Sequence, residues 1–285
     1  MEKLTNKRIY LDYNSTSPLS VSVIEYLKKG DFYFANSSSI HRSGKRSKKL
    51  VRETTEFLLS ELLKVNYSHS LFYHSGATEG INTIIKGVSS YFEKKDQRVA
   101  YFYSGADHSV CHELGSELSS LGHQVIKFGV DKNGTFDIDK LIKQINSYTC
   151  PVILNFTWVN NETGVVWNLK LAEQIKKETG CIVHVDSAQA VGKISDWNQL
   201  SSVLDFYTFS GHKFGAMKGV GFTLCHNNSK FDPLLVGGGQ QNKMRSGTEN
   251  ILGIYSIKLA MEHLLKSANY DKLESIKLNL ENNIS

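Results

Sequence analysis

The sequence predicts an α/β fold built on a mainly parallel, doubly wound β-sheet. Between about residue 70 and residue 225, short apolar runs alternate with segments in which apolar residues recur at helical spacing. This alternation is typical of parallel strands joined by crossover helices, with helices covering both faces of the sheet. Polar residues also follow several of the apolar runs directly. Ligands of such sheets bind beyond the carboxyl ends of the strands, so these polar residues favour the same fold.

The expected elements follow one another in a regular order. The first strand is "SLFYHSG" (70–76), and Ile81, Ile84, Ile85 and Val88 then recur at helical spacing. Further strands are expected at 98–104, 123–130, 151–159, 181–186, 204–210 and 219–225, and further helices at 110–121, 137–145 and 168–180. Gly180 is typical of a helix end. The strand at 219–225 is expected to be antiparallel, because too few residues precede it for a crossover helix.

The composition describes an ordinary soluble globular chain. Of its 285 residues 40% are apolar and 21% are charged, and the formal net charge is +5. The basic stretch at 41–52 is expected on the exposed face of a helix, so we expect no nucleic-acid partner. No segment resembles a signal peptide or a membrane span, and we therefore expect a cytoplasmic protein.

The four cysteines predict neither a metal site nor a disulfide framework. They are far apart and none forms a C-x-x-C pair. Cys150, Cys181 and Cys225 flank or end strand-like runs, where buried structural thiols are expected.

Five groups of polar residues are expected at one edge of the sheet. They are Ser75 to Thr78, His108, Asn160 with Asn161, Asp186, and Ser210 with His212 and Lys213. Each group alone is compatible with a helix cap or a turn. Five such groups after five strands indicate a ligand site instead.

The residue types at this edge indicate a particular ligand. "HSGATEG" (74–80) ends a strand and opens a helix, and helix N-termini bind anions such as phosphate. Asp186 ends a buried strand, so its carboxylate requires a cationic partner. Lys213 in a dry site has a lowered pKa and acts as a nucleophile towards an aldehyde. Together these three features predict a pyridoxal phosphate (PLP) site.

The motifs resemble those of a known family. They are "YLDYNSTSP", "SSSIHRSG", "SGATEGINTIIKG", "WVNNETGVV", "HVDSAQAVGK", "FSGHKFG" and "GGGQQNKMRSGTEN", in family order from residue 10 to about 250. The chain thereby resembles the cysteine desulfurases of the NifS/IscS type, within the class V, fold-type I PLP enzymes. The last motif is the most discriminating, since it resembles the desulfurase branch more than class V aminotransferases in general.

The resemblance implies a role for each candidate residue. Lys213 forms the Schiff base and moves a proton, Asp186 keeps the pyridine nitrogen protonated, and Gln189 bonds the phenolate oxygen. His108 stacks on the ring and handles protons near the substrate sulfur. The phosphate is held by Ala77, Thr78, Ser210 and His212, Asn161 lies between cofactor and substrate carboxylate, and Thr248 reaches the phosphate of the other subunit. A homodimer is therefore part of the implied site.

The chain also departs from the family pattern. The family's sulfur-accepting cysteine lies on a C-terminal loop, together with an arginine for the substrate carboxylate, and neither is present here. Cys225 follows Lys213 too closely to be that cysteine. Cys111, expected on a helix face shared with His108 and Leu114, is interpreted as a packed thiol. In addition, Gly80 replaces the usual serine.

The domain prediction follows from the resemblance. It assigns 1–15 to an N-terminal segment, 16–250 to a PLP-binding large domain and 251–285 to the start of an incomplete C-terminal small domain. In the last of these, Ile254, Ile257, Met261, Leu264 and Leu265 suit one apolar face of a long helix. Apolar surface meant for the rest of that domain is expected to be exposed or covered by a partner.

The implied function is that of a cysteine desulfurase whose C-terminal part is lost or supplied by a separate polypeptide. Such an enzyme converts L-cysteine to L-alanine and passes the sulfur to an enzyme cysteine, for iron–sulfur cluster assembly or tRNA thiolation. A sulfur-acceptor protein is then a further partner. Two alternatives remain open: a non-catalytic or degenerate subunit that partners a full-length desulfurase, and another class V enzyme such as an aminotransferase or a selenocysteine lyase.

Overall fold

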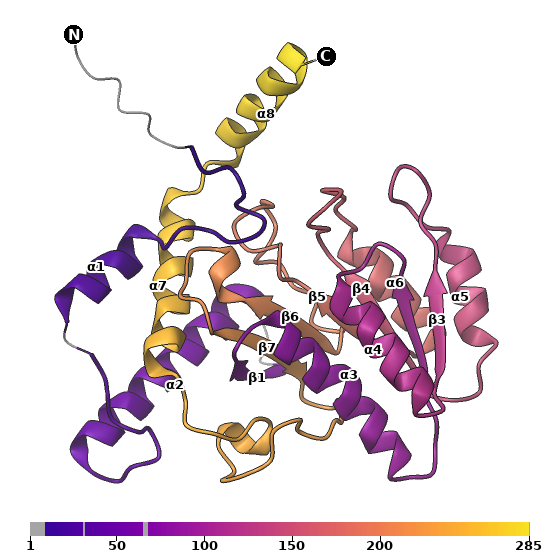
Figure 1. Cartoon of the computed structure of the whole chain (residues 1–285), viewed down its shortest axis with the longest axis horizontal. Helices are drawn as coiled ribbons and strands as arrows, with labels where there is room; N and C mark the ends of the chain where they lie inside the picture. The colour runs from indigo at the N-terminus through magenta and orange to yellow at the C-terminus, as the bar shows by residue number, and fades with distance from the viewer. Residues whose placement is uncertain (1–8, 31, 65–67, 285) are drawn as a thin grey trace.

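The described part of the chain folds around one seven-stranded sheet (Figure 1). A computed structural model describes residues 9–30, 32–64 and 68–284. The strands are β1 (His69–His74), β2 (Ala100–Ser104), β3 (Gln124–Phe128), β4 (Val152–Thr157), β5 (Ile182–Asp186), β6 (Phe206–Ser210) and β7 (Gly221–His226). Their order is β1-β7-β6-β5-β4-β2-β3, and only β7 runs against its neighbours. The predicted mainly parallel sheet and the antiparallel strand after Lys213 are therefore confirmed.

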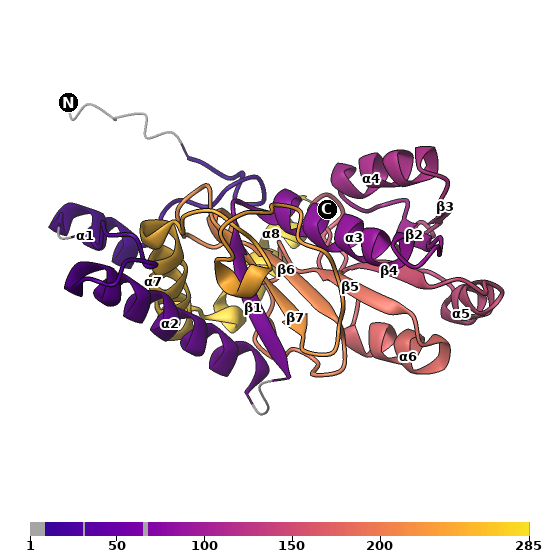
Figure 2. The same cartoon turned by 90° about the horizontal axis from the view of Figure 1, so that it is seen from below.

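Helices cover both faces of this sheet (Figure 2). They are α1 (Val21–Lys29), α2 (Arg42–Leu63), α3 (Ala77–Glu93), α4 (Ser109–Ser120), α5 (Ile138–Asn146), α6 (Leu169–Thr179), α7 (Ile251–Ser267) and α8 (Tyr270–Ile284), with short 3₁₀ turns at Gly211–Lys213 and Gln241–Lys243. One apolar cluster lies between the sheet and α3 and α4, and a larger one joins α2, α5, α6 and α7 to the opposite face. Because both faces are covered, β4 and β6 are buried at every position.

Local sequence signals explain where the helices begin and end. The side chains of Asp137 and Asn168 accept hydrogen bonds from backbone N–H groups at the starts of α5 and α6. Gly180 ends α6 in the left-handed region at φ 68°, as its position in the sequence predicts. The basic stretch at 41–52 lies largely on the exposed side of α2.

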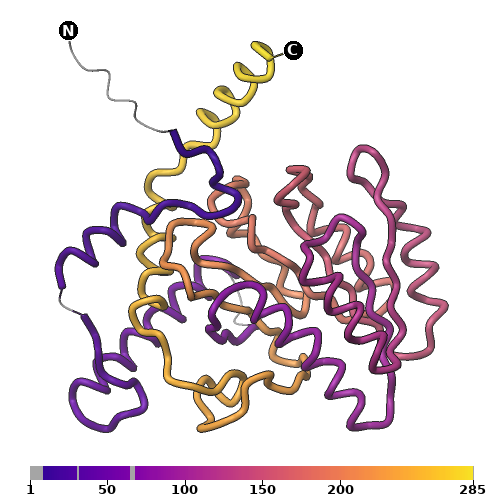
Figure 3. Tube along the Cα trace, viewed as in Figure 1, coloured from indigo at the N-terminus to yellow at the C-terminus, as the bar shows by residue number. Residues whose placement is uncertain are grey.

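Helix α7 follows the predicted apolar face with one correction. Ile254, Ile257 and Met261 are buried against the body and Leu264 packs partly against it. Leu265 is 42% exposed, because it lies in the last turn of α7, where the helix leaves the body. The following helix, α8, has no buried residue and projects from the molecule (Figures 1 and 3). That 251–285 begin a separate domain stays a prediction.

The cysteines lie in the body of the fold. Cys111, Cys181 and Cys225 are buried, as expected of structural thiols, whereas Cys150 is only half-buried because it precedes β4 at the rim of the sheet. Among the residues described, no three His, Cys, Asp or Glu side chains are grouped as metal ligands. Within the same ranges, no helix has the length and apolar character of a membrane span.

Candidate active site

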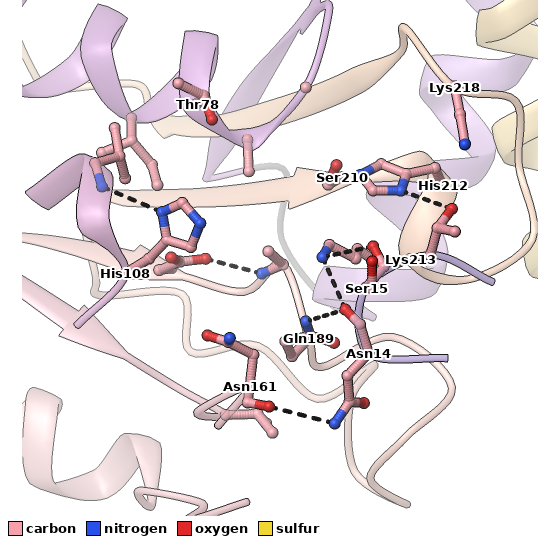
Figure 4. Close-up of a pocket in the computed structure, with 18 of the residues that line it drawn as sticks. Asn14, Ser15, Thr78, His108, Asn161, Gln189, Ser210, His212, Lys213 and Lys218 are labelled. Carbon is pink, nitrogen blue, oxygen red and sulfur yellow. Dashed lines mark hydrogen bonds between the residues drawn. The ribbon is translucent and has the colours of Figure 1, made fainter. Parts of the chain in front are cut away.

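A cavity of about 730 Å³ opens at the carboxyl ends of the parallel strands (Figure 4). Nine of the ten candidate residues line it: Ala77, Thr78, His108, Asn161, Asp186, Gln189, Ser210, His212 and Lys213. The tenth, Thr248, is exposed and does not line the cavity. The sheet topology thus collects residues from five strand ends, as the positions of these residues in the sequence indicate.

One end of the cavity is the beginning of α3. Gly76 caps this helix without a side-chain hydrogen bond, so the first N–H groups of α3 are left for a ligand. Thr78 and Ser210 line the same end. The His212 ring bonds the Thr16 hydroxyl over 3.1 Å, and burial with neighbouring lysines lowers the pKa of His212. These donors and the helix dipole suit an anion.

Asp186 supplies a buried carboxylate at the floor of the cavity. It is 6% exposed, and its Oδ1 accepts a hydrogen bond of 3.0 Å from the Ala188 N–H. Burial raises the pKa of Asp186, although the Ala188 N–H, His108 and Lys213 oppose this shift. No salt bridge to Asp186 is formed within the described part of the chain. The carboxylate therefore retains acceptor capacity for a cationic group in the cavity.

Lys213 supplies the amine that faces this carboxylate from the end of β6. Its Nζ donates to the backbone carbonyls of Asn14 at 2.8 Å and Ser15 at 3.0 Å (Figure 4). Burial lowers the pKa of Lys213, and Asp186 and Asp12 oppose that shift. The predicted lowering is confirmed in direction, although Lys213 is only half-buried.

The N-terminal segment is a part of the site to which sequence reasoning gave no residue role. Asp12, Asn14, Ser15 and Thr16 line the cavity. The Asn14 carbonyl accepts a second hydrogen bond, of 2.8 Å, from Gln189 Nε2. The available signal was the motif "YLDYNSTSP", which contains all four residues.

Lys193 is another lysine near the cavity that sequence reasoning did not single out. Its Nζ donates to Gln189 Oε1 and, over 3.1 Å, to Asn14 Oδ1. Burial, with Lys213 nearby, lowers the pKa of Lys193 to about 8. Because Lys193 does not line the cavity, its hydrogen bonds position Gln189 and the N-terminal segment.

The position of His108 corrects one expectation. His108 is the N-cap of α4, and its Nδ1 accepts from the Val110 N–H over 3.2 Å. Its ring therefore stays at the cavity, whereas Cys111 turns into the apolar cluster under α4 and is fully buried. Burial raises the pKa of Cys111 well above its usual value, with Asp107 and Asp186 adding to this. Cys111 thus packs in the same cluster as Leu114, as expected, whereas His108 precedes the helix as its N-cap.

The local packing explains why glycine occupies position 80. A Cβ atom at Gly80 would lie 2.5 Å from His74 Nε2, 2.7 Å from Thr208 Cγ2 and 2.8 Å from Thr223 Oγ1. His74 is itself 4% exposed and fills this space. A serine at position 80 would therefore overpack this space unless the neighbouring side chains shift.

The comparison with known families agrees with this geometry. Residues 9–284 match the family model described as aminotransferase class-V. The chain belongs to this family. Its members, the NifS-like enzymes included, depend on PLP.

Curated relatives place the chain more closely. It is 34% identical over 257 residues to a cysteine desulfurase of Bradyrhizobium diazoefficiens, which covers 89% of this chain and 63% of the relative. It is 32% identical over 258 residues to the cysteine desulfurase IscS of Dictyoglomus turgidum, covering 90% and 64%. The chain thus spans less than two thirds of the length of these relatives.

Solved structures share the fold. A NifS-like protein superposes with a TM-score of 0.86 at 30% identity, over 98% of this chain and 76% of that one. SspA in complex with cysteine superposes with a TM-score of 0.80 at 25% identity, covering 90% and 73%. The predicted NifS-like large domain is therefore confirmed.

Proposed function

We propose that this chain binds PLP covalently through Lys213 and provides the cofactor site of a cysteine desulfurase. The observation that carries the proposal is the cavity itself. It combines a nucleophilic amine, a buried carboxylate with spare acceptor capacity and a helix N-terminus without a side-chain cap. These groups match the aldehyde, the pyridine nitrogen and the phosphate of PLP, which when bound supplies an electron sink for reactions at Cα of an amino acid.

The residues around the cofactor would have distinct tasks. Asp186 holds a proton on the pyridine nitrogen, and Gln189 faces the phenolate oxygen. The N–H of Ala77 and the side chains of Thr78, Ser210 and His212 hold the phosphate. His108 covers the ring, and Asn161 lies towards the substrate carboxylate. After amine exchange, Lys213 moves a proton at the substrate carbon, for which its lowered pKa is suited.

L-cysteine is the proposed substrate. Support comes from relatives named cysteine desulfurase and from the structural neighbour SspA, which was solved with cysteine. Transfer of sulfur requires a thiolate that reaches the substrate. Burial raises the pKa of Cys111, Cys181 and Cys225 in this chain, so these thiols are poor nucleophiles. We therefore propose that a thiol outside this set accepts the sulfur, before transfer to iron–sulfur or tRNA-thiolation machinery.

A homodimer belongs to the same proposal. The loop that carries Thr248 is fixed to the body by Gln241, whose side chain bonds the Tyr73 N–H at 2.6 Å and the Tyr73 carbonyl at 3.0 Å. Arg245 in this loop bonds Glu79 on α3 at 2.8 Å. The loop thus presents Thr248 on the surface, where the phosphate of a second copy can accept its hydrogen bond.

The test is reconstitution with PLP after removal of single lysines. Wild-type chain should turn yellow and retain PLP through borohydride reduction, whereas Lys213→Ala should lose covalent attachment. Lys193→Ala and Lys218→Ala are the matched controls, since Lys218 lines the cavity and Lys193 has the pKa of about 8. Both should still be labelled. A colourless wild-type chain in excess PLP, or label retained in Lys213→Ala, would refute the proposal.

A further inference from the structure

A second buried carboxylate, Asp107, lies beside the cavity and has no role in the proposed function. It precedes His108 and is 6% exposed. Its Oδ2 accepts from the Ser104 N–H at 3.0 Å and from Asn155 Nδ2 at 2.9 Å. Its Oδ1 accepts from the Thr157 hydroxyl at 2.7 Å. Three donors from β2 and β4 thus hold one carboxylate in one orientation.

Thr157 connects this carboxylate to the floor of the cavity. It is paired in register with Asp186 across β4 and β5, and its side chain lines the cavity. Paired residues on neighbouring strands lie about 5 Å apart. Asp107 therefore lies directly behind the pair of residues at the cavity floor.

We propose that Asp107 is a positioning residue that acts through Thr157 and Asp186. Its carboxylate orients the Thr157 hydroxyl away from Asp186 and places a second negative charge behind it. Asp186 then binds a proton, or a protonated ring nitrogen, more tightly than it would alone. The inference deepens the proposed function, since the cation at Asp186 is the pyridine nitrogen of PLP.

The electrostatics of Asp107 and Asp186 are consistent with this role, because a negative charge on either carboxylate raises the proton affinity of the other. Burial raises the pKa of Asp107 to about 6, its three hydrogen bonds oppose the shift, and Asp186 adds to it. Both carboxylates are thus coupled in one buried site, where a charge pair interacts strongly. The other titratable groups near the two carboxylates are His108 and Lys213 at Asp186, Tyr101, Tyr103 and His112 at Asp107, and Cys111 near both.

Asp107→Asn removes the negative charge and releases the Thr157 hydroxyl hydrogen, and it keeps the positions of the contacting atoms. The asparagine Oδ1 replaces Asp107 Oδ2 and still accepts from the Ser104 N–H and from Asn155. Its Nδ2 replaces Oδ1 and donates to the Thr157 hydroxyl, which then turns its own hydrogen elsewhere. All three contacts survive while the charge is lost. Asp205→Asn is the matched control, because Asp205 is a partly buried, hydrogen-bonded carboxylate near the start of β6, at the opposite edge of the sheet.

The decisive measurement needs no cofactor. In chain labelled with ¹³C at the aspartate carboxyl carbons, the Asp186 resonance is assigned by its loss in Asp186→Asn and titrated with pH. Asp107→Asn should lower the Asp186 midpoint by about one pH unit, about tenfold in proton affinity. Asp205→Asn should leave it in place. An Asp186 midpoint that is the same in Asp107→Asn and wild type overturns the inference.

Two further readings keep the test conclusive. If Asp107→Asn does not fold, the wild-type Asp186 titration should itself show two inflections, and a single inflection overturns the inference. In chain loaded with ¹⁵N-labelled PLP, the ring nitrogen should lose its proton at lower pH in Asp107→Asn than in wild type. If the chain does not bind PLP but Asp107→Asn still lowers the Asp186 midpoint, the proposed function is refuted. The coupling of the two carboxylates then still stands.

Discussion

The cavity edge of the sheet and helix α8 differ in what their side chains contact. Beneath the cavity edge, Asp107, His184 and Thr208 are buried and hydrogen-bonded to side chains of neighbouring strands. In α8, every residue from 271 to 284 is exposed, and Leu273, Ile276 and Leu280 are 54%, 55% and 58% exposed along one side of the helix. Contacts with neighbouring strands therefore fix the side chains at the cavity edge. Helix α8, in contrast, is held by its own backbone hydrogen bonds.

A chain of hydrogen bonds beneath the cavity makes this contrast concrete. From Asp107 it runs through Asn155 to His184 at 2.7 Å, to Thr208 at 2.8 Å, to Thr223 at 2.9 Å and to His74 at 2.9 Å. It crosses five adjacent strands without reaching solvent. A buried polar network of this kind tolerates neither an added charge nor an added atom, and both can be tested.

The largest effect we expect is a loss of stability in mild acid. Burial lowers the pKa of His69 and His74 to about 4 and that of His184 to about 3. In the unfolded chain these histidines gain protons near pH 6.5, so stability falls as pH drops from 6.5 towards 4. The raised pKa of Asp107 and Asp186 opposes this, since both bind protons more readily when folded. On balance about two protons are taken up on unfolding at pH 5.

Urea unfolding at pH 7 and pH 5 measures this balance. The free energy of unfolding should be lower at pH 5 by on the order of 3 kcal/mol. His69→Gln should reduce the proton uptake by about one, because one of the three histidines is then missing. Equal stability at the two pH values would contradict the lowered pKa values. It would mean that the imidazoles contact solvent or acceptor groups that let them bind protons in the folded chain.

A smaller effect is expected when a side chain is added at position 80. Gly80→Ser places its Cβ against His74, so overpacking should destabilise the fold by about 1–3 kcal/mol. Removing the His74 imidazole relieves the shortest of the three close contacts, so Gly80→Ser should cost less in the His74→Ala background than in the wild type. Thermal unfolding of the four chains forms a double-mutant cycle, and additivity of the two changes would contradict the proposed clash.

The sequence predicted the sheet and most of the cavity because both follow local rules. Apolar periodicity located the strands, the helices between them and α7, whereas α1 was not predicted; the strand ends collected nine candidate residues in one cavity. To predict that Lys213 and Asp186 lie close together, it was enough to know that the carboxyl ends of parallel strands meet at one edge of the sheet.

What the sequence did not predict depends on contacts between distant segments. Asp107 was passed over beside His108, although Asn155 and Thr157 make it a fixed carboxylate from about 50 positions away. Asn14 bonds Gln189 and Lys213 through its backbone carbonyl, a group that every residue type carries. Side-chain identity gives no signal for such contacts, so only the fold reveals them.

The smallest effect is expected from removing α8. Deletion of 271–285 takes away no buried residue among 271–284, and it retains Tyr270, which is half-buried and packs against the body. The free energy of unfolding should change by less than about 0.5 kcal/mol, because surface changes away from packed contacts have little effect on stability. PLP binding should be unchanged, since no residue of α8 lines the cavity. A loss above about 2 kcal/mol, measured by urea unfolding at several protein concentrations, would show that Leu273, Ile276 and Leu280 are covered in solution. If the loss shrank on dilution, the cover would be a second copy of the chain, and α8 would join the cavity edge as a region held by contacts.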